Sequence, residues 1–424
     1  MRTEALARLA EERVDHRFKG LPPDADGLTV GELAAQRRNL FRAADGFTTP
    51  VLALSAERLE HNLALMEAYV ARHGLAFAPH GKTSMAPRLF HRQLEHGAWG
   101  ITLAVPHQVR VAREFGVPRI FLANELVDAA ALRWIAGELA ADPEFRFVAY
   151  VDSVRGVELM DAALRGCARP VDVVVELGAG DGARTGVRTE ADARSVAEAV
   201  GRASGTLRLV GVAGYEAQVP GADPGLVRAW LERLVSLAVE LDKAGRFAGA
   251  EEIVVSAGGS EWFDAVADVF SGIPELSLPV LKLLRSGAYV SHDDVHYSRL
   301  TPFNRVPEEG ALEPAFRLWA QVVSRPSAEQ AFLNAGKRDA AYDLDLPVAH
   351  VVRRDGTEHP AAGIEVTALS DQHLWLRTAP EADVEVGDWV GLGLSHPCTS
   401  FDKWQLIPVA EADGTVVDYI RTFF

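Results

Sequence analysis

The stretch Leu75-Ala76-Phe77-Ala78-Pro79-His80-Gly81-Lys82 contains the first sign of how the central part of the chain folds. Its first four residues are apolar and lie between Gly74 and Pro79, which is typical of a short buried strand that stops at the proline. Lys82 therefore follows the C-terminal end of a strand, the end at which α/β proteins bind ligands. A lysine desolvated there loses basicity and can form a Schiff base, whereas the alternative is an ordinary solvent-exposed loop lysine.

Seven more apolar runs follow this first strand, and helical patterns separate them. The eight predicted strands are residues 75–79, 100–104, 119–123, 145–152, 171–177, 207–214, 252–257 and 280–284. The central runs are continuously apolar rather than alternating, as expected of parallel strands that are buried on both faces. Eight such units favour an α/β fold with a closed (β/α)8 barrel, and a doubly wound open sheet is the alternative.

The alternation of strands and helices ends after about residue 300. Short strand-like runs follow at residues 316–324, 331–336, 348–353, 364–369, 373–378, 389–394 and 404–409. Gly, Pro and Asp separate them without intervening helices, which indicates an all-β domain, either a small barrel or a sandwich. We predict an N-terminal helical extension over residues 1–47, the barrel over 48–298 and the β domain over 299–424. The strand-like run at 49–55 can pair with the β domain.

Composition and charge narrow the class of protein. The 424 residues include 59 acidic and 43 basic side chains, and the net charge of −16 disfavours nucleic acid and anionic membranes as partners. The two cysteines, Cys167 and Cys398, indicate no disulfide framework and favour a reducing compartment. The first 20 residues are charged throughout, and no apolar run approaches the ~20 residues of a membrane span. We therefore expect a soluble, cytoplasmic protein.

Two glycine-containing turns end the last two barrel strands. They are Gly258-Gly259-Ser260 after the seventh strand and Arg285-Ser286-Gly287-Ala288-Tyr289 after the eighth. Glycines let backbone N–H groups approach an anion closely, and a helix N-terminus adds partial positive charge. Barrels of this kind frequently bind phosphate in the loops after these two strands, so we predict a phosphate site there. The alternative is a pair of ordinary strand-to-helix turns.

Two further side chains follow predicted strands at the same end of the barrel. Arg184 lies in the segment 176–187, which has four glycines and must turn tightly after the fifth strand. It can reach a ring nitrogen or a carboxylate, or it is a surface arginine. Tyr215 ends the sixth strand and can donate a hydrogen bond to a ligand, although most buried tyrosines belong to a core.

His396 and Cys398 are the candidate metal ligands. The two residues are two positions apart, so in an extended chain their side chains would point to the same side. One imidazole and one thiolate make half of a Zn²⁺ site and leave positions for water or substrate. A chance His-x-Cys is the alternative, because structural zinc sites usually have four protein ligands.

Together these motifs resemble the D-serine dehydratase and D-threonine aldolase family. The family consists of pyridoxal-phosphate enzymes with an alanine-racemase-type barrel and a C-terminal β domain, and the resemblance covers roughly residues 48–410. The motifs that carry it are Pro79-His80-Gly81-Lys82-Thr83, Arg184-Thr185-Gly186-Val187, Gly214-Tyr215-Glu216, Ser256-Ala257-Gly258-Gly259-Ser260, Arg285-Ser286-Gly287-Ala288-Tyr289 and His396-Pro397-Cys398.

The resemblance implies a role for each of these residues. It makes Lys82 the lysine that holds pyridoxal 5'-phosphate and takes the α-proton, with His80 as a second catalytic residue. It assigns His396 and Cys398 to Zn²⁺ or another divalent metal. The implied cofactor-binding residues are Lys82, Arg184, Tyr215, Gly258, Gly259, Ser260, Gly287 and Tyr289.

The resemblance also suggests the reaction. His-x-Cys is similar to the D-serine dehydratase pattern, whereas the aldolases carry His-x-Asp. We therefore expect a metal-assisted deaminase that converts a small β-hydroxy D-amino acid to a 2-oxo acid and ammonia, acting as a homodimer. A D-threonine-type aldolase, an amino-acid racemase and a non-catalytic pyridoxal-phosphate-binding protein are the alternatives. Ala78 and Ser84 depart from the family, which commonly has arginine and histidine there.

Overall fold

Parallel strands alternating with helices build the central part of the chain, as the sequence predicts. The computed structural model describes Met1 and residues 3–424, apart from the side chains of Thr3 and Ala222. The chain divides into two units. One consists mainly of residues 67–82 and 93–287, and the other of 83–92 and 288–424 together with the N-terminal region up to Met66.

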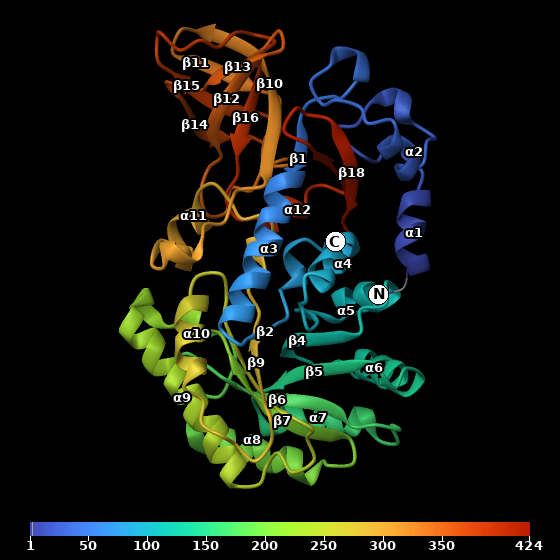
Figure 1. Ribbon diagram of the computed structural model, residues 1–424, viewed down its shortest axis with the longest axis vertical. Helices are drawn as coiled ribbons and strands as arrows, with labels where there is room; N and C mark the ends of the chain where they lie inside the picture. The colour runs from blue at the N-terminus through green and yellow to red at the C-terminus, as the bar shows by residue number, and fades with distance from the viewer. Residues whose placement is uncertain (2) are drawn as a thin grey trace. The chain divides into compact units, whose positions relative to one another are not determined.

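The first unit contains an eight-stranded parallel sheet with the order β2-β9-β8-β7-β6-β5-β4-β3 (Figure 1). Its strands are β2 (Ala76–Phe77), β3 (Ile101–Leu103), β4 (Arg119–Glu125), β5 (Arg146–Val151), β6 (Val171–Leu177), β7 (Leu207–Gly214), β8 (Ile253–Ala257) and β9 (Val280–Leu284). A parallel bridge between His80 and Thr102 joins the two ends of this order. The Thr102 N–H donates to the Pro79 carbonyl at 2.9 Å, and the Trp99 N–H donates to the Phe77 carbonyl at 2.7 Å. The closed barrel is therefore confirmed, and the open sheet is excluded.

Helices connect the strands of the barrel and lie outside the curled sheet (Figure 1). They are α5 (Pro106–Glu114), α6 (Ala129–Ala141), α7 (Val154–Leu164), α8 (Glu190–Arg202), α9 (Pro224–Lys243) and α10 (Phe263–Ser271), whereas most of α4 (Pro87–Glu95) belongs to the second unit. Four of them begin at a side chain that accepts a backbone N–H of the first turn, namely Asp128, Ser153, Thr189 and Asp223. These caps bond N–H groups that have no partner within the helix.

The interior of the barrel is a packed apolar core. Its buried cluster consists of Ala78, Phe121, Val148, Tyr150, Val174, Val210, Ala213, Val254 and Leu283. Successive strand side chains point to opposite faces, so the second residue beyond each of these faces the interior again. The polar side chains at the C-terminal ends of the strands therefore lie at one mouth of the barrel.

The second unit is built on a ten-stranded mixed sheet. Its strands are β1 (Val51–Ser55), β10 (Phe316–Ser327), β11 (Gln330–Leu333), β12 (Val348–Arg354), β13 (Thr357–Pro360), β14 (Ile364–Leu369), β15 (Leu374–Thr378), β16 (Trp389–Gly393), β17 (Leu406–Ala410) and β18 (Val416–Arg421). β1, for which the sequence left the pairing open, runs antiparallel to β10 and parallel to β17. β13 and β18 are absent from the prediction. β13 is a largely exposed hairpin partner of β12, so it has no alternating apolar pattern.

The N-terminal region packs on this second sheet. It contains α1 (Thr3–Glu11) and α2 (Val30–Ala35), followed by β1 and α3 (Ala56–Arg72). The capping box predicted before α2 is present, with Thr29 and Glu32 each bonding the other's backbone N–H. One buried cluster joins Val14 and Phe18 to Trp319 and Tyr419. The region thus stabilises the sheet by covering apolar surface. Of the helices in the described chain, none is both long and apolar enough to cross a membrane.

Candidate functional site

Lys82 lies where the sequence predicts, just beyond the C-terminal end of a barrel strand. It is the middle residue of a 3-10 turn, η3 (Gly81–Thr83), and its side chain is half-buried. On the neighbouring side of the mouth, a Cβ added at Gly287 would lie 2.6 Å from the His80 carbonyl oxygen. A glycine is therefore required there, because any side chain would collide with the backbone next to Lys82.

His80 is a neutral imidazole among positive charges. Its Nδ1 atom is buried and has no hydrogen-bond partner among the described residues. Burial lowers the pKa of His80 well below its usual range, and the charges of Lys82, Arg285 and Arg184 lower it further. Three positive charges thus act on His80, which favours an anion at this side of the mouth.

The glycine turn after β8 already has a partner within the protein. The Gly258 and Gly259 N–H groups donate to the two oxygens of the Glu216 carboxylate, at 2.9 and 2.6 Å. Glu216 is fully buried, and burial raises its pKa. The sequence indicated the turn but not this carboxylate, which holds the loop in shape. Ser260 follows the two glycines directly.

Tyr215 and Arg184 lie together beside the same turn. A Cβ at Gly259 would meet the Tyr215 ring at 2.6 Å, so the glycine lets the ring pack against the loop. The Arg184 guanidinium lies 5.7 Å from the centre of that ring. Arg188 donates to the carbonyls of Ala183, Thr185 and Gly186, which folds the glycine-rich loop that carries Arg184.

Arg285 is a buried cation for which the sequence suggested no separate role. Its Nε donates to the Ser256 hydroxyl at 2.9 Å, and another guanidinium nitrogen donates to the Gly214 carbonyl. The guanidinium lies 5.7 Å from the Tyr150 ring. Arg285 thus links the ends of three strands and brings positive charge to the barrel mouth.

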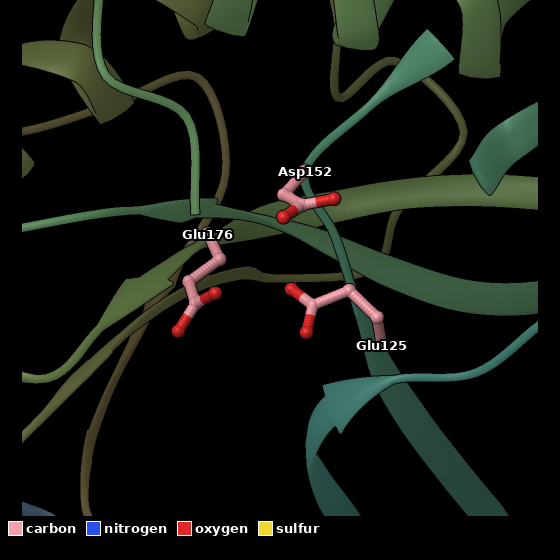
Figure 2. A group of neighbouring side chains, drawn as sticks. All are labelled: Glu125, Asp152 and Glu176. Carbon is pink, nitrogen blue, oxygen red and sulfur yellow. The ribbon is translucent and has the colours of Figure 1, made fainter. Parts of the chain in front are cut away.

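Three carboxylates form a group at the ends of neighbouring strands β4, β5 and β6 (Figure 2). Oxygen atoms of Glu125, Asp152 and Glu176 all lie within 4.8 Å of one another. Burial, followed by the charge of Glu176, raises the pKa of Glu125 to about 9, and burial raises the pKa of Glu176. The sequence analysis did not predict this group. The signal for it is the two-residue period of a strand, since Asp152 and Glu176 each follow a core residue, Tyr150 or Val174, by two positions.

The barrel mouth has features that fit pyridoxal phosphate. Glycines 258, 259 and 287 keep side chains out of the turns at the ends of β8 and β9. Lys82, Arg184 and Arg285 supply positive charge, and His80 Nδ1 is a buried polar atom without a partner. Positive charge favours a phosphate, and a buried polar atom with no partner among the described residues is normally bonded by a polar ligand. The Gly258 and Gly259 N–H groups are bonded to Glu216, so the turn contributes space rather than free donors.

His396 and Cys398 also lie together, in the second unit. His396 has a left-handed backbone (φ 49°), and its N–H donates to the Asp293 carboxylate at 3.0 Å. Its Nδ1 lies 2.6 Å from an Asp343 oxygen, and the Cys398 sulfur lies 3.3 Å from the Thr83 hydroxyl oxygen. The neighbouring Cys398, followed by Asp343, raises the pKa of His396 to about 9.

Asp343 is the residue of this group that the sequence did not reveal. A carboxylate on one ring nitrogen of a histidine orients the ring and presents the other nitrogen to a metal. With one nitrogen and one sulfur donor, the pair suits zinc and leaves further positions for other ligands. The remaining predicted residue, Tyr289, is buried in η6 (Ala288–Val290) of this second unit, and its role at the cofactor stays a prediction.

The fold and the mouth define an alanine-racemase-type barrel with an added β domain, and the comparisons with known proteins agree. The family model described as "Alanine racemase, N-terminal domain" matches residues 54–268, about half of the chain. A model described as a serine dehydratase domain matches residues 315–410. The chain belongs to the alanine racemase N-terminal domain family, and the resemblance seen in the sequence is confirmed.

The chain is similar to named lyases over most of its length. D-threonine aldolase of Arthrobacter sp. is 26% identical over 374 residues, 87% of this chain and 90% of the relative. D-threo-3-hydroxyaspartate dehydratase of Delftia sp. is 26% identical over 400 residues, 88% and 97% of the two chains. The structure of D-threonine aldolase from Filomicrobium marinum superposes with a TM-score of 0.73 at 26% identity, covering 89% and 95%. The expectation of a lyase is therefore confirmed.

Proposed function

We propose that the protein is a pyridoxal-phosphate-dependent lyase that eliminates water from a β-hydroxy D-amino acid, whose unsaturated amine product is then hydrolysed to a 2-oxo acid and ammonia. The observation that carries the proposal is Lys82 beside the positively surrounded His80 and the glycine turns, at the mouth of an alanine-racemase-type barrel. The relatives named as a hydroxyaspartate dehydratase and as aldolases support a β-hydroxy D-amino acid as the substrate class.

In this proposal, the barrel residues bind and orient the cofactor. Lys82 holds its aldehyde carbon, while Ser260 and Gly287, with the turn that Gly258 and Gly259 shape, receive the phosphate. Tyr215 and Arg184 lie beside the ring, and Tyr289 completes the site. Pyridoxal phosphate, when bound, supplies a ring that withdraws electrons from the α-carbon of the substrate.

Proton transfer falls to Lys82 and His80. The Lys82 amine, released when substrate binds, accepts the α-proton. His80 is neutral because burial and three nearby cations lower its pKa, so its Nδ1 can accept a hydrogen bond or a proton from the substrate.

His396 and Cys398 would hold a divalent metal, with zinc favoured by the nitrogen and sulfur donors. Such an ion, when bound, polarises a hydroxyl group and makes it a better leaving group. Asp343 would keep the His396 ring oriented through its 2.6 Å contact with Nδ1. A solved mutant of the Delftia dehydratase is described as its metal-free form, which implies that this relative can bind a metal.

The first experiment identifies the cofactor lysine. Purified protein is reduced with borohydride in the presence of pyridoxal phosphate, digested and mapped by mass spectrometry, and the label is expected on Lys82. The exposed Lys243 gives a matched control, because Lys243→Ala must leave the labelling unchanged. A label on another lysine, or on none, contradicts the proposal.

The second experiment separates the reactions. Purified protein is incubated with D-serine, D-threonine and D-threo-3-hydroxyaspartate, and with their L-forms, and all products are quantified. The dehydratase proposal predicts a 2-oxo acid and ammonia. Aldolase is the second candidate, since several of the similar proteins carry that name, and it predicts glycine plus an aldehyde.

We also propose a homodimer in a reducing, cytoplasmic environment. The two cysteines of the chain are free, which agrees with a reducing compartment. Light scattering coupled to size-exclusion chromatography measures the mass of the assembly directly. A mass equal to one chain would exclude the dimer.

A further inference from the structure

The three carboxylates at the barrel mouth have the geometry of an ion site. Glu125 lies at the end of β4, Asp152 directly follows β5, and Glu176 lies near the end of β6. The strands are neighbours in the sheet, and Figure 2 shows the carboxylates turned toward a common space. Oxygens around an octahedral ion at about 2.1 Å lie roughly 3.0 to 4.2 Å apart, so oxygens within 4.8 Å can share one ion after a small adjustment.

Burial raises the pKa of Glu176 and the positive charge of Arg285 lowers it, but Arg285 forms no ion pair with this group. Among the described residues, no lysine or arginine forms an ion pair with Glu125, Asp152 or Glu176. The Arg285 guanidinium instead donates hydrogen bonds to the Ser256 hydroxyl and the Gly214 carbonyl. Both oxygens of Glu125 and one of Glu176 are buried without a hydrogen-bond partner in the described chain. Buried carboxylates in native proteins are normally paired, protonated or bound to a metal. A proton held between Glu125 and Glu176 satisfies part of this group, and a bound cation would satisfy all of it.

Tyr150 is a second, independent sign of a missing ligand. It is 3% exposed, and its hydroxyl has no hydrogen-bond partner among the described residues. It lies opposite Glu125 in the register of β4 and β5, and it precedes Asp152 by two residues on the same face. Burial raises the pKa of Tyr150, the charge of Arg285 lowers it, and the charges of Glu176 and Glu125 raise it.

We propose that Glu125, Asp152 and Glu176 bind one divalent metal ion that prefers oxygen ligands, of the Mg²⁺ or Mn²⁺ class. Three carboxylates without nitrogen or sulfur donors suit hard cations, which retain some water ligands. The Tyr150 hydroxyl has the right chemistry to bond such a water. This site differs from the His396–Cys398 pair in its residues and in its donor atoms, and it does not depend on the proposed reaction.

The bound ion has a definite structural role. The Gly186 N–H donates to an Asp152 oxygen at 3.2 Å, so the group also holds the loop that carries Arg184. Without an ion, the carboxylates repel one another and weaken this anchor. With an ion, the ends of the three strands and the loop are joined at one point. Metal binding therefore orders residues 178–187.

Mn²⁺ binding is measured on the whole protein after it has been loaded with one equivalent of Zn²⁺ per chain and excess Zn²⁺ has been removed, so that the nitrogen and sulfur donors are occupied and the carboxylates are left open. Free Mn²⁺ is quantified by electron paramagnetic resonance, and one tightly bound ion per chain is expected. Glu176→Gln and Asp152→Asn should each weaken binding by about 10-fold or more. The matched control is Glu158→Gln, an exposed barrel glutamate outside the group, which should bind Mn²⁺ as the wild type does.

Hydrogen exchange gives a readout that needs neither turnover nor variants. Adding Mg²⁺ to chelator-treated wild-type protein should slow exchange of the amides in residues 178–187 and leave the sheet of the second unit unchanged. The proposal is overturned if wild-type protein binds no Mn²⁺ beyond the Zn²⁺-occupied positions. It is also overturned if folded Asp152→Asn binds Mn²⁺ with wild-type affinity, whatever the fate of the more buried Glu176→Gln.

Discussion

Two groups of potential metal ligands differ in how the chain assembles them. In the second unit, His396 and Cys398 are two residues apart. The extended chain expected there is wrong, because His396 has φ 49° and Cys398 begins the short helix α12 (Cys398–Phe401), but the two side chains still lie together. In the barrel, Glu125, Asp152 and Glu176 come from three strands that only the sheet makes neighbours. A ligand pair encoded by local spacing is visible in a sequence, whereas one assembled by strand register is not.

The two groups also differ in their charge balance. His396 has opposite charges beside it, and Cys398 and Asp343 raise its pKa to about 9. In the barrel group, burial and the charge of Glu176 raise the pKa of Glu125 to about 9, and burial raises the pKa of Glu176 although the charge of Arg285 lowers it. The His396–Cys398 pair is therefore partly balanced by the protein itself. The barrel group needs either shared protons or a bound cation.

The largest expected effect is in the barrel. Lys82→Ala should lower kcat by about a thousandfold or more, because it removes both the cofactor attachment and the base. Steady-state kinetics on the best D-amino acid of the panel, with the absorbance spectrum of the protein, measure this. Lys243→Ala is the control and should retain wild-type activity. Full activity of Lys82→Ala would show that chemistry takes place elsewhere.

Removing the sulfur donor tests the second group. Cys398→Ala should lower zinc affinity by 10-fold or more and kcat by about 100-fold, because the metal loses a ligand and the leaving hydroxyl loses its activation. Cys167→Ala, the other free cysteine, is the matched control. Metal analysis after dialysis and kinetics at saturating zinc measure both quantities. Unchanged zinc content in Cys398→Ala contradicts the assignment.

A smaller effect tests how tightly the mouth is built. Gly287→Ala should lower the free energy of unfolding by about 1–3 kcal/mol, because its Cβ would lie 2.6 Å from the His80 carbonyl oxygen. Gly137→Ala provides the contrast, since nothing lies within 4 Å of its Cβ inside α6, and it should stabilise the protein by about 1 kcal/mol. Urea unfolding measures both changes, and equal stability of the two variants would refute the close contact.

The smallest effect is a pH dependence of stability in chelator. The pKa of Glu125 is raised in the folded protein, so its stabilising contribution is present below the unfolded pKa of about 4.3 and is lost as pH rises toward about 9. Compared with Glu125→Gln, the wild type should lose free energy of unfolding progressively across this range. Urea unfolding between pH 5 and 9 measures the difference. Saturating Mg²⁺ should reduce it, and parallel curves without the ion would contradict the raised pKa.

Much of the fold could be predicted from the pattern of apolar runs in the sequence. The runs at 171–177, 207–214 and 280–284 coincide with β6, β7 and β9, because strands buried on both faces must be continuously apolar. β18 was missed although it is apolar, and β13 was missed because its exposed residues lack the pattern. Closure of the barrel through His80 and Thr102 leaves no such signature, since it consists of backbone contacts.

By itself, the sequence determined the eight strand–helix units, the position of Lys82 at a strand end, the glycine turns and the proximity of His396 to Cys398. Each of these follows from periodicity or spacing over a few residues. Only the tertiary structure decided that Glu216 bonds the glycine turn, that Asp343 orients His396, and that three acidic side chains converge. These contacts join residues that are tens of positions apart in sequence. Their partners are therefore chosen by strand register and packing, which no local pattern encodes.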